Sequence, residues 1–379
     1  MRTDNNLITR RTFTRNVMKT CAGAAFINSV IFRRLAVGSQ SQNLVKAEHW
    51  VKLPEGNIKC MLCPNECVLE PGADGICRSR GNRDGIHYSL VYGRPAIIAL
   101  DLIEKAPLYH FYPNINAFSI ATSGCNLSCR FCQNFAISQS HPDGVKYYNL
   151  SPDAVIEKAL KNNIQSINFF YTEPTIYFEY VKEIALRAKK MKLKTVCVTA
   201  GYIKEKPLKE LIPLMDAFVI GLKGFDNVFY QKYIGCRLEH IKKSIKIVSS
   251  VSDTTWLEVV NLLVPGLNDN SRTIQEMCTW FSNEIGTDIP FHFTRFEPNY
   301  QLKELPRTPI ETLVSAFTTA KNSGMKYVYI GNLPGHDQGN TVCPKCGAVL
   351  IERVNFRVIK NRLKKGKCTC GNVIPGRWG

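Results

Sequence analysis

Beyond its first 45 positions, the sequence has no long apolar run. A membrane-spanning helix needs about 20 consecutive apolar residues. No stretch after residue 45 reaches that length, so we expect no transmembrane segment. The chain also contains no internal repeat and no low-complexity tract. Its hydrophobic content of 45% is ordinary for a globular protein and excludes wholesale disorder.

Acidic residues are also few. The chain has 31 Asp and Glu against 49 Lys and Arg, which gives a formal net charge of +18. Such a charge can serve a nucleic-acid partner, but the basic residues are scattered, with local runs at 189–194 and 353–367. Scattered surface charge more often serves solubility or an acidic partner. We therefore do not expect nucleic acid to be the partner.

Cysteine, in contrast, is abundant and clustered. There are 15 cysteines in 379 residues, a length that allows one sizeable domain with small appendages. Disulfide scaffolds are typical of short secreted chains, whereas clustered cysteines in a long enzyme-like chain indicate metal binding. Four cysteines stand alone and are interpreted as buried apolar residues. They are Cys21, Cys197, Cys236 and Cys278.

Residues 1–45 form a leader. The pair Arg10 and Arg11 precedes a modestly apolar stretch over 17–32. This arrangement resembles a twin-arginine export signal, although polar residues interrupt the apolar stretch. The alternatives are a disordered basic leader or a translation start that has been assigned too far upstream.

The rest of the chain divides into three predicted regions. A Cys- and Gly-rich module covers 46–105, and a second Cys module covers 339–379. Between them, region 106–338 alternates short apolar runs with stretches of helix length. The runs that we expect to be strands cover 117–122, 166–171, 195–200, 217–222, 256–264, 291–296 and 327–331.

Two of the intervening stretches have clear helix signals. The stretch 151–163 begins with Ser151 as N-cap and Pro152 in the first turn. The stretch 174–192 is amphipathic, and its basic residues come late, as the helix dipole prefers. Apolar strands that alternate with helices indicate parallel strands covered by helices. We therefore predict an α/β fold, a partial (β/α) barrel of the TIM type, with its chemistry at the C-terminal ends of the strands.

Three cysteines follow the first predicted strand, in the stretch GCNLSCRFCQN. Cys125, Cys129 and Cys132 have the spacing Cys-x3-Cys-x2-Cys, with no fourth cysteine nearby. Four thiolates close a zinc or cubane site, whereas three thiolates on a [4Fe–4S] cluster leave one iron open to a substrate. One tight loop can bring three sulfurs to one cube, with Phe131 shielding it from solvent. The alternative is a structural zinc site with a distant fourth ligand.

The stretch from Cys125 to Cys132 resembles the signature of radical S-adenosylmethionine (SAM) enzymes. The resemblance implies a radical SAM barrel whose [4Fe–4S] cluster is held by Cys125, Cys129 and Cys132, with the open iron on the amine and carboxylate of SAM. It also implies reductive cleavage of SAM to a 5′-deoxyadenosyl radical that abstracts hydrogen from a substrate. A low-potential electron donor is then expected as a partner.

Two further elements are similar to the glycyl-radical-enzyme activases. In YTEPT, Glu173 and Pro174 match an element that contacts the SAM amino group, while Tyr171 and Thr172 replace its usual glycines. This resemblance implies that Thr172, Glu173 and Pro174 bind the cofactor. For Glu173 the alternative role is that of an acidic residue at a helix N-terminus.

The second of these elements is IGLKGF. This stretch resembles the Asp-x-Lys region of the activases. The resemblance implies that Lys223 is a cofactor-binding residue. Gly221 stands where the activases have the acid. Longer stretches, among them IEKAPLYHFYP and WLEVVNLLVPGLND, extend the resemblance over residues 50–379. Together they resemble the AmmeMemoRadiSam-system radical SAM enzymes, which are related to the pyruvate formate-lyase activating enzymes.

The two flanking modules offer further thiols. The N-terminal set permits a structural zinc ion or a second iron–sulfur cluster, with zinc slightly favoured, and free cysteines in a small core are the alternative. This set is Cys60, Cys63, Cys67 and Cys77. The C-terminal set reads as the two knuckles of a zinc ribbon, although its second knuckle is Cys-x-Cys, which strains the geometry. That set is Cys343, Cys346, Cys368 and Cys370.

The sequence therefore predicts a radical SAM enzyme that acts on an unknown small molecule or protein. A glycyl-radical-enzyme activase is the enzymatic alternative. A non-catalytic Fe–S and zinc protein that carries electrons or binds nucleic acid is the alternative of another class. SAM and a low-potential donor are expected in the cytoplasm, so we expect the enzyme there. Periplasmic location by twin-arginine export is the alternative.

Overall fold

The computed structural model describes residues 44–379. The leader predicted over 1–45, with its twin-arginine resemblance, lies outside the described residues except for its last two positions. Of the helices formed within 44–379, none combines the length and the apolar character that crossing a bilayer takes.

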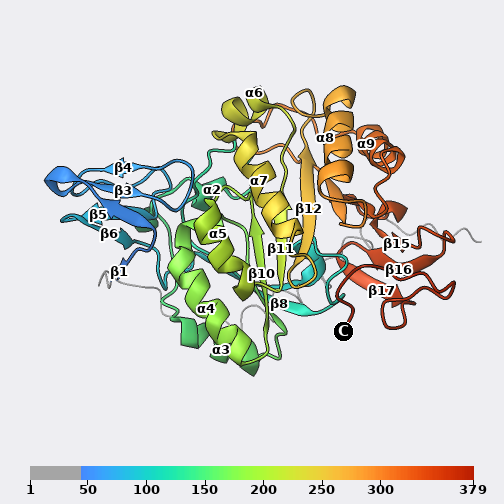
Figure 1. Cartoon of the computed structure of the whole chain (residues 1–379), viewed down its shortest axis with the longest axis horizontal. Coiled ribbons are helices and arrows are strands. Elements are labelled where there is room, and N and C mark those ends of the chain that lie inside the picture. The colour runs from blue at the N-terminus through green and yellow to red at the C-terminus, as the bar shows by residue number, and fades with distance from the viewer. Residues whose placement is uncertain (1–43) are drawn as a thin grey trace, which may run out of the picture. The chain divides into compact units, whose positions relative to one another are not determined.

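An eight-stranded sheet forms the centre of the described structure (Figure 1). Strands β8 to β14 are parallel and adjacent in chain order, and β7 pairs antiparallel with β8 at one edge. The two edge strands, β7 and β14, each have one neighbour, so the barrel is partial, as predicted. The strands are β7 (Ile97–Leu102), β8 (Asn116–Ala121), β9 (Ser166–Phe169), β10 (Lys194–Thr199), β11 (Ala217–Gly221), β12 (Trp256–Leu263), β13 (Phe291–Arg295) and β14 (Val328–Gly331).

All seven predicted strands are confirmed, with ends that differ by at most two residues. They are mostly apolar because both of their faces are covered, and every residue of β9 and β11 is buried. Strand β7 was not predicted. It lies within the region 46–105 of the predicted N-terminal module, yet it pairs with β8 of the central sheet.

Helices cover the outside of the sheet (Figure 1). Ser151 caps α3 as expected, because its hydroxyl accepts a hydrogen bond of 3.2 Å from the Ala154 amide. The predicted helix over 174–192 begins as the 3-10 turn η4 and continues as α4. The longer helices are α3 (Pro152–Lys161), α4 (Phe178–Lys190), α5 (Glu205–Leu211), α7 (Leu238–Ser249), α8 (Ser271–Glu284) and α9 (Ile310–Asn322).

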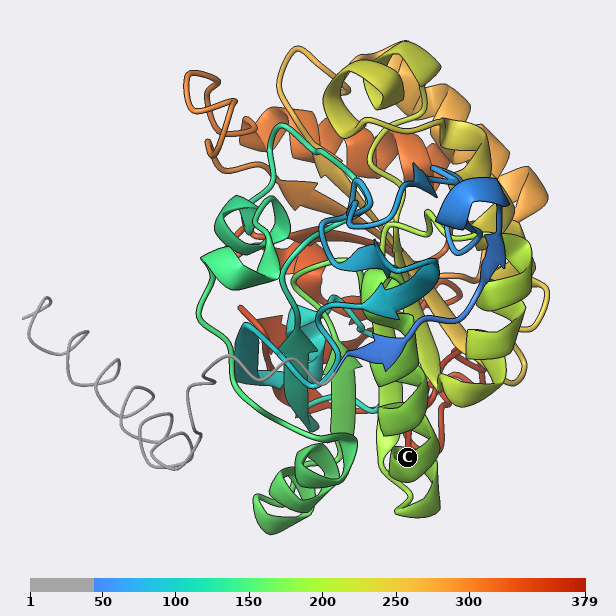
Figure 2. The same ribbon diagram turned by 90° about the vertical axis from the view of Figure 1, so that its left-hand side faces the viewer.

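The N-terminal module consists of two small antiparallel sheets, with strand orders β1-β6-β5 and β2-β3-β4. Figure 2 views the molecule from the side of this module, where both sheets lie in front of the barrel strands. The strands are β1 (Val45–Lys46), β2 (Trp50–Lys52), β3 (Ile58–Cys60), β4 (Val68–Leu69), β5 (Arg80–Arg83) and β6 (Ile86–Ser89).

The C-terminal module is a three-stranded antiparallel sheet of β15 (Thr341–Val342), β16 (Val349–Val354) and β17 (Arg357–Asn361). It shares a hydrophobic cluster with the barrel, in which Tyr109, Tyr327 and Tyr329 pack with buried residues of the module. The Arg353 guanidinium lies 4.2 Å from the centre of the Tyr109 ring and donates to the Tyr109 carbonyl at 2.7 Å. Aromatic and cation–π contacts therefore attach the module to the barrel.

Candidate functional site

The three cysteines of GCNLSCRFCQN lie on the loop that follows β8. This loop leaves the C-terminal end of a parallel strand and ends at the short helix α2 (Phe135–Ser138). Cys129 is buried, and Cys125 and Cys132 are half-buried. Among the described residues these three sulfurs do not form a group within 4.8 Å of one another. They are thus farther apart than ligands of a single ion, as a larger group requires.

Gly124 brings this loop against the N-terminal module. Its φ of +89° lies in the left-handed region, and a Cβ added here would lie 2.3 Å from the Cys77 carbonyl oxygen and 2.0 Å from the Ser79 hydroxyl. The Gly124 amide donates to the Ile137 carbonyl at 2.9 Å. Only glycine combines this φ with so close an approach, so the position requires it.

A helical turn after β11 holds the middle of the loop. The turn, η6 (Tyr230–Ile234), is π-helical. The amides of Ser128 and Arg130 donate to the carbonyls of Ile234 and Tyr233, both at 2.9 Å. Such π turns are rare and are frequent at functional sites. The conformation of the cysteine loop therefore depends on a segment 106 positions away along the chain.

Phe131, the predicted shield, is 3% exposed. Its ring stacks on Phe229 of α6 (Asn227–Phe229), with centroids 6.3 Å apart and planes at 14°. Since Phe131 directly precedes Cys132, the two rings form an apolar wall beside the thiols. An apolar wall keeps water away from this side of the site.

Glu173 follows β9, and its carboxylate accepts four hydrogen bonds. Oε1 accepts from the amide and hydroxyl of Thr175, at 3.2 and 2.7 Å, and from the Thr199 hydroxyl at 2.6 Å. Oε2 accepts only from the Ala200 amide, at 2.9 Å. Burial, and then the charge of Glu173, raise the pKa of the Cys125 thiol, so the two residues are near each other. Because each carboxylate oxygen has two lone pairs, Oε2 can accept one more donor.

The residues beside Glu173 fix its position. The Thr172 hydroxyl donates to the Thr122 carbonyl at 2.9 Å, which ties the end of β9 to the loop after β8. Pro174 begins η4 (Pro174–Tyr177), and Glu173 is the N-cap of this turn. The capping role considered for Glu173 is thus present, and it uses Oε1 rather than the free lone pair of Oε2.

Tyr171 has a left-handed backbone, with φ +71°. The activases carry glycine here, the residue that adopts this conformation most easily. In this chain three contacts hold the tyrosine instead. Its hydroxyl donates to Asp101 at 2.7 Å and accepts from Lys105 at 2.8 Å, and its carbonyl accepts from the Asn134 amide group at 2.7 Å.

Lys223 follows β11 and lies near the cysteine loop. Burial raises the pKa of the Cys129 thiol to about 11, and the Lys223 ammonium opposes this rise. A Cβ at Gly221, where the activases have an acid, would lie 3.5 Å from Lys223 Nζ. An acidic side chain at 221 could therefore pair with the lysine. With glycine there, the ammonium is left to interact with the thiols.

Cys236 also lies in this region, although its surroundings in the sequence did not indicate this. It was interpreted as an isolated apolar cysteine, and it is buried. Burial and the neighbouring Cys129 raise the pKa of its thiol, whereas Lys223 lowers it. Cys236 is therefore close to both residues. No signal in the sequence could have indicated this, because the loop after η6 carries no motif.

The four C-terminal cysteines gather as a zinc ribbon requires. Their sulfurs all lie within 4.8 Å of one another, with 3.7 Å between Cys343 and Cys370 and 3.6 Å between Cys346 and Cys368. Tetrahedral zinc with bonds of about 2.3 Å places its sulfurs about 3.8 Å apart. The pKa of the Cys368 thiol is lowered to about 6, mainly by a hydrogen bond from the backbone amide of Cys370. This lowering favours the thiolate form, which is the form that binds zinc. The Cys-x-Cys knuckle thus permits the geometry.

The four N-terminal cysteines line one cavity without gathering. Asn126 of the cysteine loop and Thr175 of η4 line the same cavity. In the described part of the chain, no three of the four sulfurs lie within 4.8 Å of one another. The four are Cys60, Cys63, Cys67 and Cys77.

His110, in the stretch PLYHFYP, belongs to the contact between barrel and C-terminal tail. Its Nδ1 donates to the Pro375 carbonyl at 2.6 Å, and its Nε2 accepts from the Tyr329 hydroxyl at 2.5 Å. Its backbone amide donates to the Glu258 carboxylate at 2.7 Å. The imidazole is fully buried among these partners. This histidine is therefore structural.

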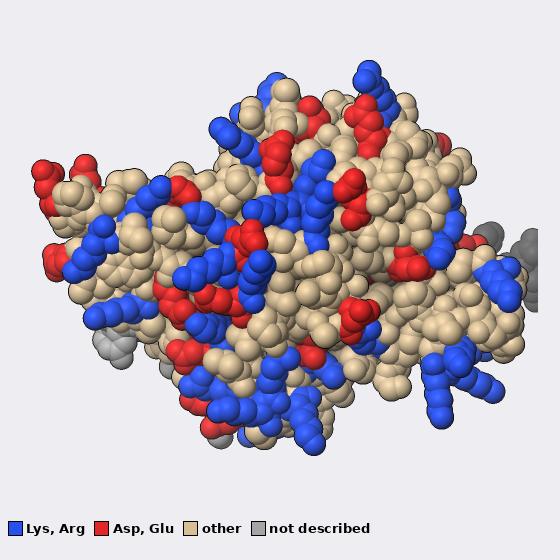
Figure 3. All heavy atoms as spheres, viewed as in Figure 1, with Lys and Arg blue, Asp and Glu red and all other residues tan. Residues whose placement is uncertain are grey.

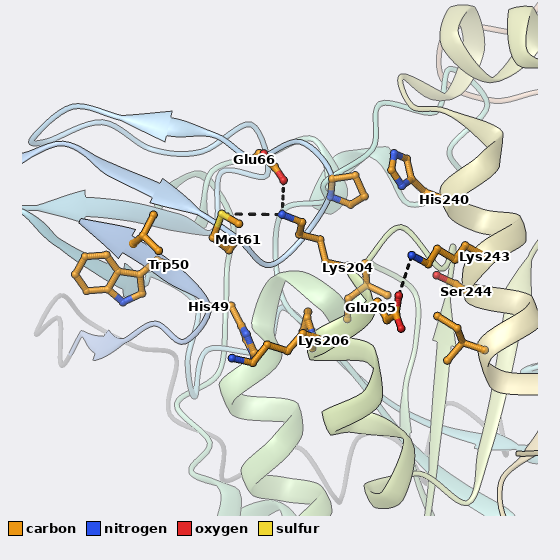
Figure 4. Close-up of a pocket in the computed structure, with 15 residues that line it drawn as sticks. His49, Trp50, Met61, Glu66, Lys204, Glu205, Lys206, His240, Lys243 and Ser244 are labelled. Carbon is orange, nitrogen blue, oxygen red and sulfur yellow. Dashed lines mark hydrogen bonds and ion pairs between the residues drawn. The ribbon is translucent and has the colours of Figure 1, made fainter. Parts of the chain in front are cut away.

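A separate cavity of about 550 Å³ lies between the N-terminal module and helices α5 and α7 (Figure 4). Lys204 binds the Glu66 carboxylate, and Lys243 pairs with Glu205 at 2.8 Å. None of the predicted site residues lines this cavity. On the face drawn in Figure 3, Lys and Arg are interspersed with Asp and Glu, in keeping with the scattered charge of the sequence.

Comparisons of the sequence with known proteins indicate the family of the chain. The family model described as "Radical SAM superfamily" matches residues 119–281, which include the cysteine loop, Glu173 and Lys223. An uncharacterized protein of Methanocaldococcus jannaschii, MJ0808, is 40% identical over 332 residues, 87% of this chain and 98% of that protein. A second, MJ0674, is 22% identical over 285 residues, 71% of this chain and 76% of that protein.

Among solved structures, a radical SAM methyltransferase from Sphaerobacter thermophilus matches with a TM-score of 0.48 and 13% identity. The match covers 81% of this chain and 82% of that one. The family model confirms the superfamily predicted from Cys125, Cys129 and Cys132, and the AmmeMemoRadiSam branch stays a prediction. The chain belongs to the radical SAM superfamily and is a radical SAM enzyme.

Proposed function

We propose that this enzyme holds a [4Fe–4S] cluster on Cys125, Cys129 and Cys132 and cleaves SAM reductively to abstract hydrogen from a substrate. The observation that carries the proposal is the meeting of three groups at the C-terminal ends of β8, β9 and β11. These groups are the cysteine loop, the Glu173 carboxylate and the Lys223 ammonium. Parallel barrels carry their chemistry at this end.

The donor set fits the cluster. Three thiols lie on one loop, and their sulfurs are spread rather than gathered for one ion. Cluster ligands are thiolates, and the chain supplies partners for their charge. The Leu127 amide donates to the Cys125 sulfur, and the Lys223 ammonium acts on Cys129. Phe131 and Phe229 keep water from one side, which protects an oxidisable cluster.

The Glu173 carboxylate fits the amino group of SAM. Oε1 is occupied by three donors, and these fix the orientation of the group. Oε2 has one lone pair left, to which an ammonium can donate a charge-assisted hydrogen bond. Thr172 and Pro174 position the carboxylate, through the Thr122 carbonyl and the start of η4.

When bound, the cluster and SAM supply one-electron cleavage of the sulfonium, which yields the 5′-deoxyadenosyl radical. The residues of this chain bind the cluster and SAM, orient SAM and shield the cluster from water. The electron comes from a low-potential donor, and we place the enzyme with that donor and with SAM in the cytoplasm. The substrate is a small molecule or a protein. We further propose a zinc ion on the C-terminal cysteines, whose sulfur spacing suits it.

The test is release of 5′-deoxyadenosine by anaerobically reconstituted protein after reduction. Cys125→Ala/Cys129→Ala/Cys132→Ala should abolish it, and Cys278→Ala should not, because Cys278 is a buried thiol on α8 outside the site. Cleavage of SAM by the triple variant would refute the assignment of these ligands.

A further inference from the structure

The four cysteines of the N-terminal module reach one cavity from separate segments. Cys60 ends β3, Cys63 and Cys67 lie between β3 and β4, and Cys77 lies before β5. Cys60 and Cys77 are buried, and the other two are half-buried. Leu62, Leu69 and Ile176 close the walls with apolar groups. The thiols therefore share an enclosed space rather than a solvent-exposed surface.

The four sulfurs are too far apart for one ion. The C-terminal set serves as an internal reference, because its four sulfurs lie within 4.8 Å of one another. Among the described residues no three sulfurs of the N-terminal set meet that limit. In this respect the N-terminal set is like Cys125, Cys129 and Cys132. A cubane holds its ligand sulfurs farther apart than zinc does, because four irons and four sulfides separate them.

The backbone is arranged around the thiols as it is around metal ligands. The amides of Leu62, Asn65 and Ser79 each donate to the sulfur of the cysteine two positions earlier. The Leu127 amide does the same for Cys125 of the radical SAM loop. Hydrogen bonds to sulfur stabilise thiolate ligands and tune cluster potentials. This pattern distinguishes the set from free cysteines in a core.

Gly75 leaves space between two of the sulfurs. A Cβ added at this position would lie 3.7 Å from Cys77 Sγ and 3.8 Å from Cys67 Sγ. With glycine there, no side chain enters the space that faces both thiols. A close backbone approach to a bound group is a common reason for glycine.

His87 lines the cavity and has no hydrogen-bond partner. Its side chain is fully buried, and neither ring nitrogen has a partner in the structure. A buried polar group without a partner is costly, so an unpaired buried imidazole indicates a bound ligand, ion or water that satisfies it. The inorganic sulfides of a cubane would accept the imidazole N–H. A zinc ion offers no such acceptor beyond its thiolates.

A buried arginine supplies positive charge to the same cavity. Arg80 lines it and is paired with Glu179 through two hydrogen bonds of 2.8 Å. Arg80 is near enough to Cys60 and Cys77 for its charge to act on both sulfurs, and Glu179 cancels this charge only in part at Cys60. A cluster with four thiolate ligands is anionic, so a fixed cation beside it reduces the cost of its burial.

We propose that Cys60, Cys63, Cys67 and Cys77 hold a second [4Fe–4S] cluster. Zinc was slightly favoured for this set from the sequence alone, and the spread of the four sulfurs argues against it. With four thiolate ligands every iron is coordinated, so the cluster has no open position and serves electron transfer.

The position of this second cluster beside the radical SAM loop indicates a role in supplying electrons to that loop. Asn126, the residue after Cys125, lines the cavity. The Asn65 amide group donates to the Asn126 carbonyl at 2.9 Å, and the Ser79 hydroxyl donates to the Ser123 carbonyl at 2.8 Å. The cluster would accept one electron from a low-potential donor and give up that electron toward the site on Cys125. This role rests on the proposed function, whereas the presence of the cluster does not.

The test is a metal count on the full chain after anaerobic reconstitution. The unsubstituted protein should contain about eight irons, four for each cluster, with matching sulfide and one zinc. Cys125→Ala/Cys129→Ala/Cys132→Ala should keep about four irons and a reduced paramagnetic signal that SAM does not change. Cys63→Ser/Cys67→Ser should keep about four irons whose signal SAM does change. Cys278→Ala is the matched control and should lose no iron.

The outcomes separate this inference from the proposed function. Two zinc ions and only four irons in the unsubstituted protein would overturn the second cluster and leave the first intact. Eight irons without release of 5′-deoxyadenosine would leave the second cluster standing and refute the proposed chemistry. If the cysteine variants fail to fold, spectra of the unsubstituted protein still decide whether a second cluster is present. They should contain two reduced signals, of which one responds to SAM, and a single signal would contradict the inference.

Discussion

The side-chain amide of Asn65 donates a hydrogen bond of 2.9 Å to the backbone carbonyl of Asn126. The bond joins the N-terminal cysteine module to the radical SAM loop, at the residue that follows Cys125. Together with the contact of Gly124 against Cys77 and Ser79, it makes the module a wall of the catalytic region. Substitutions in the N-terminal module should therefore change the conformation or the spectrum of the radical SAM loop.

Asn65→Ala should lower the free energy of unfolding by about 1–2 kcal/mol, because the partly buried Asn126 carbonyl loses its donor. Denaturant unfolding measures the change. The spectrum of the cluster on Cys125 should also shift. Asn322→Ala, at the exposed end of α9, is the control and should change neither. An unchanged spectrum in Asn65→Ala would show that the two regions are not coupled.

Glu173→Gln should weaken SAM binding about 10- to 100-fold, the equivalent of one charge-assisted hydrogen bond. Iron content should stay the same, because Glu173 is not a cluster ligand. Binding of SAM is measured from the change it causes in the paramagnetic spectrum. Asp153→Asn removes a carboxylate from the exposed start of α3 and is the matched control. Equal SAM affinity in the two variants would argue against Glu173 as a ligand.

Phe131→Ala should shorten the life of the cluster in air severalfold, because water and oxygen would reach the thiols. The decay of the iron–sulfur absorbance after exposure to air measures it. Phe356→Ala serves as the comparison, since Phe356 is 36% exposed and lies outside the barrel. Decay at the same rate in both variants would mean that Phe131 does not shield the site.

Cys346→Ser should lower the melting temperature and remove zinc while iron content remains, because a structural ion contributes to folding rather than to chemistry. The effect should be transmitted to the barrel through the cluster of Tyr109, Tyr327 and Tyr329. Thr369→Ser changes the exposed residue between Cys368 and Cys370 and should have little effect. Zinc-free protein with an unchanged melting temperature would contradict a structural role.

His110 should make stability depend on pH. Burial lowers the pKa of His110 from 6.5 to about 4. In the unfolded chain this histidine takes up a proton near pH 6.5, so the folded state loses stability as the pH falls from 6.5 to 4. The loss is about 3 kcal/mol, because a tenfold change in a proton-binding constant corresponds to about 1.4 kcal/mol.

The variant His110→Gln cannot titrate at this position. It should be less stable than the unsubstituted protein at pH 7, and the difference in unfolding free energy should shrink toward pH 4. Denaturant unfolding at several pH values measures this difference. A constant difference over that range would mean that His110 is not held neutral by its surroundings.

Much of the catalytic domain was predictable because its signals are local. The seven apolar strands, the Ser151 cap and the spacing of Cys125, Cys129 and Cys132 are properties of contiguous residues. Strand β7 and the short strands of both modules were missed. Most of the module strands have only two to four residues and therefore no periodicity to read, and β7 pairs in the opposite direction to its sheet.

The composition of the site, in contrast, came from packing between distant segments. No motif could indicate that Cys236 lies near Cys129, that η6 holds the cysteine loop, or that Asn65 reaches Asn126. The clearest case is the two sets of four cysteines, both of which were compatible with zinc from their sequence. One set gathers within 4.8 Å and the other stays spread around a buried His87. Spacing along a chain limits which thiols can meet, but the distance between them depends on how the surrounding strands and loops pack.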